Sequence, residues 1–392
     1  MSENVLAPLQ VQLDWLQNSG IQIPDGDDIG GVYAWIDEAA AKPSFIYPEI
    51  TGYYATLCCH LAAHQPDAGW IDRARSACDW ILRVAQEEGS GAILGRKYVD
   101  DPTGAESDIY AFEHRLTLFF DAVMVGYGLC STFDATGDQR YLDAAIRVGD
   151  TCLELFESDG GQVRHAVYDL NKQAAVPSGP RWSAHFASFE MKGVMFLESL
   201  AKQSERPEYA AMAERMLVAA LETQQESGRF PTDGSQAATH LHPHCYTLEG
   251  LLWLVSNRDR RELLPHIRRG IAWAFENCLL IENRIQQWSE QPDLVIRGVR
   301  TDTVSQVFRA YHLTKMLDID ASWSWEGQLE PLYEKLSSFG TDSGATIYGE
   351  DEYGKKLSHS NSWCHMFRVE MLVYRQLRES QMAVDLSKLI IT

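Results

Sequence analysis

The sequence lacks the short motifs that mark two large classes of enzyme. It contains no GxxxxGK[ST] loop, no GxGxxG run after a strand and no GxSxG turn. Such motifs need glycine because the backbone must approach a phosphate closely or turn sharply beneath a nucleophilic serine. These absences argue against an NTPase and against a serine hydrolase.

Positive charge is also scarce. The chain has 34 Lys and Arg residues against 55 Asp and Glu residues, which gives a formal net charge of -21. Nucleic acids and anionic membrane surfaces attract proteins through a positive field, so neither is expected as a partner. The 392 residues are 45% hydrophobic, which is ample for a globular core.

Long hydrophobic runs and paired cysteines are missing as well. No apolar segment approaches the length needed to cross a bilayer, and the first residues, MSENVLAPLQ, contain no apolar signal segment. We therefore expect a cytoplasmic protein. The eight cysteines form no CxxC pair, so reduced and buried thiols are expected.

Two kinds of helix alternate along the chain. Runs with few charges predict helices that are buried on all sides, whereas runs with one charged face predict helices on the surface. The apolar helices are expected to begin near Pro48, Phe112, Ser188, Tyr246, Thr303 and Trp363. The amphipathic helices are expected over 6–16, 71–86, 139–157, 207–225, 260–277 and 326–338.

This alternation predicts an all-α fold, the (α/α)6 toroid of six helical hairpins, as a single domain over 1–392. An open solenoid is the alternative. It would expose its last apolar helix, and the segment 363–377 is too apolar to face water. A closed ring is therefore favoured.

The connections that lead into the apolar helices are long and carry short β-prone runs. These runs lie at 30–35, 91–98, 160–169, 228–233, 283–288 and 344–351. The connections at the other end of the hairpins are shorter. Long loops carry function more often than short ones, so we expect the site where the apolar helices begin.

The beginnings of these helices carry aromatic, carboxylate, histidine and amide side chains. Aromatic rings stack on sugars, polar groups bond their hydroxyls, and free N–H groups at helix starts favour hydroxyl-rich or anionic ligands. A sugar is thus the expected ligand. The residues are Tyr47, Glu49, Tyr53, Asp108, Tyr110, Glu113, His114, Arg115, Trp182, His185, Glu190, His242, His244, Tyr246, Glu249, Arg300, Asp302, Gln306, His359, Asn361, Trp363 and His365.

Basic residues gather in the same loops despite the negative net charge. Together they indicate a carboxylated or phosphorylated sugar. For any single one of them, a solvated loop charge is the alternative. They are Arg96, Lys97, Arg164, Lys172, Arg181, Lys192, Arg229, Arg297, Arg300, Lys355 and Lys356.

Glu49, Glu190 and Glu249 each stand ahead of a glycine in an apolar helix. Glu49 lies between Tyr47 and Tyr53, where it can act as a general acid or base or can simply complement the positive end of the helix dipole. For Glu190 and Glu249, a structural bond to a neighbouring loop is the alternative to a catalytic role.

The run His240-Leu-His242-Pro-His244 is the most conspicuous histidine cluster. In an extended segment, alternate residues point the same way and can bind a metal, but no HExxH, CxxC or acidic triad accompanies the run. We therefore expect no metal, and a catalytic or sugar-bonding histidine instead. Asp302 follows Arg300 and is either a helix N-cap or a carboxylate oriented by that arginine.

The segment Tyr47-Pro-Glu-Ile-Thr-Gly-Tyr-Tyr54, together with the helix alternation and the β-prone loops, resembles (α/α)6 carbohydrate-active proteins. These are six-hairpin glycosidases, polysaccharide lyases, the helical domain of glucuronyl C5-epimerases and VpsJ-like polysaccharide-biosynthesis proteins. N-acylglucosamine 2-epimerases share the fold and the approximate length. The resemblance covers nearly the whole chain in architecture but only 47–54 as a motif, and it implies acid/base chemistry on a sugar.

We therefore expect an enzyme that acts on a sugar or oligosaccharide, with a uronic acid as the favoured constituent, by epimerisation, elimination or hydrolysis. A non-catalytic glycan-binding or scaffold protein in polysaccharide biosynthesis is the alternative. No cofactor is expected. The expected catalytic residues are Glu49, Glu113, His185, Glu190, His244 and Asp302. The expected sugar-binding residues are Tyr47, Tyr53, Arg96, Tyr110, Trp182, His242, Tyr246, Glu249, Arg300, Asn361, Trp363 and His365.

Overall fold

The contacts of the chain divide it into two compact units. The N-terminal unit comprises Leu16–Phe186 and Gly193–Arg215 with Thr392, and the C-terminal unit comprises Met1–Trp15, Ala187–Lys192 and Met216–Ile391. A single domain over 1–392 stays a prediction. The computed structural model describes residues 6, 9–87, 89–99, 115–157, 167–177, 187–232, 237–282, 284–380, 385 and 391–392.

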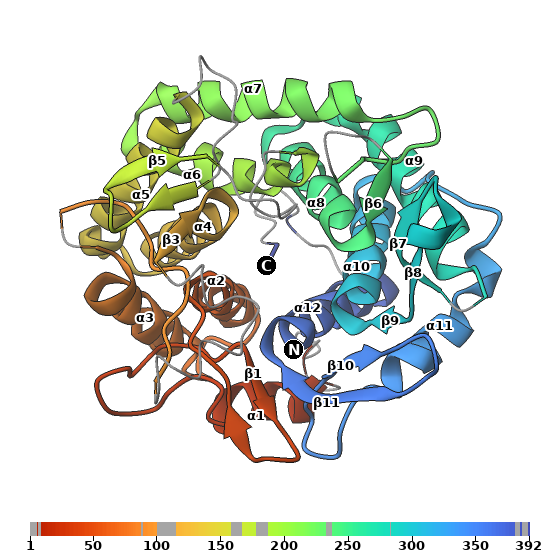
Figure 1. Cartoon of the computed structure of the whole chain (residues 1–392), viewed down its shortest axis with the longest axis horizontal. Coiled ribbons are helices and arrows are strands. Elements are labelled where there is room, and N and C mark those ends of the chain that lie inside the picture. The colour runs from red at the N-terminus through yellow and green to blue at the C-terminus, as the bar shows by residue number, and fades with distance from the viewer. Residues whose placement is uncertain are drawn as a thin grey trace. The chain divides into compact units, whose positions relative to one another are not determined.

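In the N-terminal unit, the apolar helices α2, α4 and α6 lie next to one another, and the amphipathic helices α3 and α5 pack against them (Figure 1). The predicted alternation of buried and amphipathic helices is therefore present. The bounds are α2 Pro48–His64, α3 Trp70–Trp80, the π-helical turn η2 Ile81–Ala85, α4 Phe119–Thr136, α5 Gln139–Glu157 and α6 Val194–Ser204.

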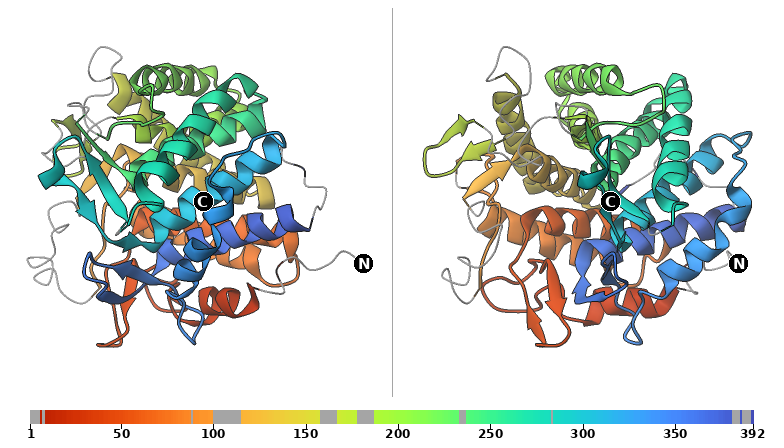
Figure 2. Two further views of the ribbon diagram at one scale, coloured as in Figure 1. Left: turned by 90° about the vertical axis from the view of Figure 1, so that its right-hand side faces the viewer. Right: turned by 45° about the vertical axis from the view of Figure 1, so that its right-hand side comes forward.

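The C-terminal unit repeats this arrangement, with α10 between α8 and α12, and with α9 and α11 packed against them (Figures 1 and 2). The bounds are α8 Leu241–Arg258, η7 Arg261–Leu263, α9 Leu264–Ala274, η8 Phe275–Leu279, α10 Thr301–Leu317, η10 Glu326–Gln328, α11 Glu330–Ser337 and α12 Ser362–Glu379. Three elements have residues in both units, namely α1 Gln10–Asn18, η6 Ser188–Gly193 and α7 Pro207–Thr223.

Short antiparallel strands form in the β-prone connections. In the N-terminal unit, β1 Trp35–Asp37 pairs with β2 Lys42–Pro43, and β4 Val167–Asp169 lies between β3 Leu116–Leu118 and β5 Ala174–Val176. In the C-terminal unit, β7 Ile285–Ser289 lies between β6 Ala238–His240 and β8 Ile296–Arg297, and β10 Ile347–Glu350 lies between β9 Val299–Arg300 and β11 Lys356–Asn361. The turn η9 spans Pro292–Leu294.

Four of these strands run directly into apolar helices: β3 into α4, β6 into α8, β9 into α10 and β11 into α12. The expected helix start near Phe112 was therefore wrong, because Leu116–Leu118 is a strand and α4 begins at Phe119. The hydroxyl of Thr117 fixes this strand by accepting a hydrogen bond from the Ile93 amide at 3.0 Å and donating to the Ile93 carbonyl at 2.7 Å.

The extended conformation expected for the histidine run was also wrong. The strand β6 ends at His240, and α8 begins at Leu241, so His242 and His244 lie in its first turn. Pro243 is compatible with this position because the first-turn N–H groups have no partner within the helix. Residues two apart on a helix face different directions, so the two histidines do not form a pair.

The cysteine prediction is confirmed, since all eight cysteines are free and buried. Within the part of the chain that the structure describes, no helix has both the length and the apolarity needed to span a membrane.

The helices α2 and α4 approach each other through glycine. A Cβ atom at Gly52 would lie 2.7 Å from the Met124 carbonyl oxygen and 2.7 Å from the Val125 Cα. A second contact between α2 and α4 joins Cys59 Sγ and Thr132 Oγ1 at 3.7 Å. Thr132 follows Cys59 by 73 residues, as Val125 follows Gly52, so the two helices run parallel. This register places Glu49, one turn before Gly52, level with the first turn of α4.

Replacing Gly52 with alanine should push these two helices apart. The added methyl group meets backbone atoms that cannot rotate away, so the free energy of unfolding should fall by about 1–3 kcal/mol. Urea unfolding followed by circular dichroism measures the change. Gly327→Ala is the matched control, because nothing lies within 4 Å of a Cβ atom there. Equal stability of the two variants would contradict the packing argument.

Candidate functional site

The inner helices of the C-terminal unit carry polar residues at matching heights. The second residues of α8, α10 and α12 are His242, Asp302 and Trp363. The sixth residues are Tyr246, Gln306 and Phe367. The ninth residues are Glu249, Arg309 and Glu370. Because each helix starts directly after a strand, these residues form three layers beginning at the helix N-termini.

The first layer is organised around the carboxylate of Asp302. Trp363 donates its indole N–H to Asp302 Oδ2 at 3.0 Å, and Arg300 donates through Nε to Oδ1 at 3.2 Å and through a second nitrogen to Oδ2. Burial by itself would raise the pKa of Asp302, but Arg300 and His242 hold this pKa well below its ordinary range. Asp302 is therefore an ionised, fully buried anchor. We call His242, Arg300, Asp302, Gln306 and Trp363 the histidine centre.

The imidazole of His242 lies at the edge of this layer. Its Nδ1 is 2.6 Å from Gln306 Oε1 and 3.7 Å from Asp302 Oδ2, and its ring centroid is 4.4 Å from that of Tyr246. The residue is 9% exposed. Burial lowers the pKa of His242 to about 4, although Asp302 acts in the opposite direction. The ring is thus neutral at pH 7 and can accept a proton.

The third layer consists of buried ions. Arg309 donates to Glu249 and to Glu370, and Lys192 Nζ lies 2.8 Å from Glu249 Oε2. All four side chains are fully buried. Burial lowers the pKa of Lys192 to about 8, with Glu249 opposing the shift. At pH 7 two cations face two carboxylates, so the layer is electrically balanced.

A second polar group lies in the N-terminal unit, at the starts of α2 and α4. Asp121, in the first turn of α4, hydrogen-bonds the carboxyl group of Glu49, and Tyr47 also hydrogen-bonds Glu49. Arg96 donates to Asp121 Oδ2 at 3.3 Å, and its guanidinium carbon lies 3.7 Å from the centre of the Tyr47 ring. We call Tyr47, Glu49, Arg96 and Asp121 the carboxyl centre.

The two carboxyl groups of this centre retain a proton at neutral pH. Burial raises the pKa of Asp121 to about 8, and the negative charge of Glu49 raises it further, while Arg96 opposes both effects. One guanidinium can balance only one of two buried carboxylates. Asp121 is therefore a protonated acid at pH 7 beside an acceptor that it can exchange protons with.

Two predicted histidines are enclosed by backbone partners. His244 is 1% exposed, its Nδ1 accepts from the Phe230 amide at 3.3 Å, and its Nε2 lies 3.0 Å from the Gly270 carbonyl. His365 is fully buried, with Nε2 2.9 Å from the Gln12 carbonyl and its ring 4.5 Å from Trp15. Because both nitrogens of His244 bond the backbone, we propose a structural role for it instead of the expected catalytic one.

Several other predicted residues lie inside the protein core. Glu190 is fully buried, Tyr53 is 2% exposed, and Asn361 caps α12 by accepting from the Cys364 amide at 3.0 Å. The predicted residues Tyr110, Glu113, Trp182 and His185 lie outside the described residues.

The sequence reasoning missed Asp121, Arg309 and Glu370. Each is a charged residue within a largely apolar helical run, namely FFDAVMV, VFRAYHL and RVEMLVY, of which the last also contains Arg368. A helix predicted to be buried all round cannot expose such a charge, so a charged partner on a neighbouring helix could have been expected.

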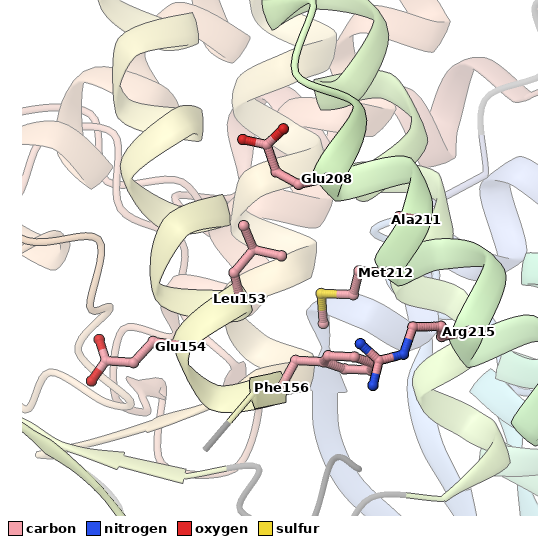
Figure 3. A pocket seen from close by; sticks show the side chains of 7 residues that line it. All are labelled: Leu153, Glu154, Phe156, Glu208, Ala211, Met212 and Arg215. Carbon is pink, nitrogen blue, oxygen red and sulfur yellow. The ribbon is translucent and has the colours of Figure 1, made fainter. Parts of the chain in front are cut away.

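Two hollows on the described part of the surface lie away from both centres. Leu153, Glu154 and Phe156 of α5 and Ala211, Met212 and Arg215 of α7 line a groove of about 350 Å³ together with Glu208 (Figure 3). A second hollow, of about 710 Å³, is lined by residues between Gln17 and Ser76. Neither contains a residue of the two centres. Among the described residues, no three His, Cys, Asp or Glu side chains are arranged to hold a metal ion.

The fold is that of (α/α)6 toroid carbohydrate-active enzymes, as predicted. A sugar epimerase from a ruminal bacterium superimposes with a TM-score of 0.72 at 10% identity, over 96% of this chain and 100% of that one. Cellobiose 2-epimerase from Spirochaeta thermophila DSM 6192 gives 0.67 at 12% identity, over 97% and 99%. An unsaturated glucuronyl hydrolase specific for heparin gives 0.64 at 11% identity, over 97% and 99%.

At these identities the likeness shows the fold alone. No family model matches the sequence, and a search of the curated proteins finds no match.

Replacing Asp121 with asparagine should stabilise the protein at neutral and alkaline pH. The native state keeps the Asp121 proton up to about pH 8, whereas the unfolded chain loses it near pH 4, so this group costs stability as pH rises through that interval. Asparagine removes the cost, so the gain should be absent at pH 4 and should grow by up to about 1.4 kcal/mol per pH unit as the pH rises toward 8. Urea unfolding at several pH values measures it.

The exposed Asp67→Asn is the control, and its effect should be small at every pH. Destabilisation of Asp121→Asn at pH 8 would show instead that the ionised carboxylate of Asp121 supports the fold.

Proposed function

We propose that this protein is an enzyme that moves a proton on a sugar or oligosaccharide, next to a carbonyl or carboxylate group, with His242 as the proton acceptor. The observation that carries the proposal is the neutral, partly accessible imidazole held between Asp302 and Gln306. Removal of a C–H proton leaves an enediolate. Its reprotonation on the opposite face gives an epimer, and loss of a neighbouring substituent gives an elimination product.

The surroundings of His242 suit a sugar. Tyr246 and the half-buried Trp363 offer aromatic faces beside fixed polar groups, which is the combination that sugar binding uses. The similarity to a sugar epimerase and to a cellobiose 2-epimerase supports this class of reaction by fold alone.

A uronic acid is the more specific part of the proposal. Arg300 is the cation of the histidine centre, and its side chain is 24% exposed. It holds Asp302 through two N–H groups, so a sugar carboxylate would compete with Asp302 for the guanidinium. For this reason the activity screen described below includes neutral sugars as well as uronic acids.

Hydrolysis by the carboxyl centre is less favoured. Two-carboxylate glycosidases separate their carboxyl groups by about 5–5.5 Å or about 6.5–9.5 Å, which leaves room for the sugar and a water. Glu49 and Asp121 are hydrogen-bonded to each other, which is too close for that arrangement.

Incubation with sugars in heavy water tests the proposed reaction without knowledge of the product. An enzyme that abstracts a C–H proton should introduce solvent deuterium into its substrate, detected by mass spectrometry or NMR. The screen uses mannose, cellobiose, glucuronate and uronic-acid oligosaccharides. His242→Gln should lower the rate of exchange by on the order of 10²–10⁴, because the proton acceptor is removed.

His266→Gln is the matched control, since His266 is a half-buried histidine on α9 outside the histidine centre. Undiminished exchange in His242→Gln would rule out His242 as the base. Sugar binding by calorimetry, with neither exchange nor cleavage in the unmodified protein, would favour the alternative of a glycan-binding or scaffold protein in polysaccharide biosynthesis.

A second candidate activity is the opening of a sugar ring at the carboxyl centre. A protonated and an ionised carboxyl group in contact can give one proton and take another. Asp121 would protonate the ring oxygen while Glu49 removes the proton of the anomeric hydroxyl; the bond between C1 and the ring oxygen breaks, and the C1 carbonyl forms. Glu49 and Asp121 each keep some exposure, 6% and 4%.

Mutarotation measures this activity directly. The unmodified protein should speed the exchange between α and β anomers of glucose, mannose or glucuronate, followed by NMR. Asp121→Asn and Glu49→Gln should each reduce the acceleration by about 10²-fold. Asp67→Asn should retain it. An exchange rate equal to that in buffer, or full activity in Asp121→Asn, would eliminate this candidate.

A further inference from the structure

We propose that Gln306, oriented by Glu249, is a positioning residue that holds the proton of His242 on Nδ1 and leaves Nε2 as the atom that accepts a proton from the sugar. The inference deepens the proposed function and rests on it for its catalytic meaning. The proton position itself can be measured without any substrate.

When ionised, the carboxylate of Glu249 can accept hydrogen bonds but cannot donate them. Burial would raise the pKa of Glu249, but Arg309 and Lys192 bring it below its ordinary value. Lys192 approaches Oε2, and Arg309 donates to Oε1. The carboxylate is thus held at both oxygens, with Oε1 accepting a hydrogen bond from Arg309 and Oε2 paired with the ammonium of Lys192.

The orientation of the Gln306 amide follows from this. Its side-chain nitrogen lies 3.1 Å from Glu249 Oε1, and an ionised carboxylate can face only the NH₂ group of an amide. The amide oxygen must then point the other way, toward His242, from which it is 2.6 Å distant. Gln306 is fully buried, so water does not compete for either end.

The orientation of the Gln306 amide fixes the tautomer of His242. An amide oxygen is only an acceptor, so Nδ1 must carry the hydrogen, and the neutral ring keeps its lone pair on Nε2. Asp302 favours the same arrangement, because its Oδ2 lies 3.7 Å from Nδ1 and attracts a hydrogen there. A chain of hydrogen bonds therefore runs from the ion layer to the reacting histidine.

Nitrogen-15 labelling of the histidines reads the tautomer directly in long-range proton–nitrogen spectra of the full-length protein. His242, identified by its loss in His242→Gln, should show the Nδ1–H form at pH 7. His244 is an internal control with the opposite form, because its Nδ1 accepts from the Phe230 amide. An Nε2–H form or a charged ring at His242 would overturn the proposal.

Three variants then test the chain of hydrogen bonds. Gln306→Leu removes the acceptor, so His242 should lose its preference for Nδ1–H, and kcat for deuterium exchange should fall by on the order of 10²-fold with a smaller change in KM. Glu249→Gln should have a similar effect because the Gln306 amide is then free to reverse. Gln224→Leu is the matched control, since Gln224 pairs with His266 and not with His242.

The double variant Glu249→Gln with Gln306→Glu gives the decisive test of the hydrogen-bond chain. The glutamate at 306 can only accept hydrogen bonds when ionised, so it accepts from His242 Nδ1–H whichever way the glutamine at 249 turns. The acceptor beside His242 and the net charge are thereby restored. The double variant should recover the Nδ1–H form and most of the lost kcat.

A purely structural role predicts another pattern, in which stability falls and the tautomer and the kcat of the folded fraction do not change. That result would overturn the proposal, as would a double variant no better than Glu249→Gln. If Gln306→Leu does not fold, the unmodified spectrum and the double variant still decide. If the tautomers behave as expected but no sugar exchanges deuterium, the proposed function fails while the hydrogen-bond chain stands.

Discussion

The C-terminal unit depends on the two buried ion pairs of the Arg309 guanidinium. The guanidinium bonds a carboxylate from the helix on each side, Glu249 on α8 and Glu370 on α12, and none of the three side chains is exposed. A buried charge without a partner costs several kcal/mol, so any sliding of one helix against another would be strongly unfavourable. The ion layer therefore fixes the relative heights of three helices that apolar packing alone would leave less specified.

The site follows from this register. Because Glu249, Arg309 and Glu370 are the ninth residues of their helices, the second residues also meet, and these are His242, Asp302 and Trp363. The N-terminal unit fixes its register differently, through the backbone contact of Gly52 with Met124 and Val125. The result is comparable, since this contact brings Glu49 and Asp121 together at the starts of α2 and α4. Ions and glycines thus serve the same purpose in the two units.

Much of the fold could be predicted because it depends on local patterns. The alternation of uncharged and amphipathic runs predicted the (α/α)6 fold. Four of the six β-prone runs overlap strands, namely β1, β4, β7 and β10, whereas 91–98 and the described part of 228–233 contain none. The helix starts at Phe119 and Leu241 could not be predicted, because strand pairing with distant segments decides them. The partners of Asp302 within the histidine centre were partly foreseen through Arg300, whereas Asp121 was missed because its meaning depends on Glu49, which is 72 residues away in sequence (121 − 49).

The charges of the two centres also bear on the substrate. The predicted basic residues near them are engaged with carboxylates: Arg300 with Asp302, Arg96 with Asp121, and Lys192 with Glu249. Counted with Arg309 and Glu370, the histidine centre and its ion layer hold three cations and three anions. A cluster of arginines and lysines in a sequence therefore indicates an anionic ligand only where carboxylates do not already neutralise it. The proposed acid/base chemistry therefore does not depend on the sugar being acidic.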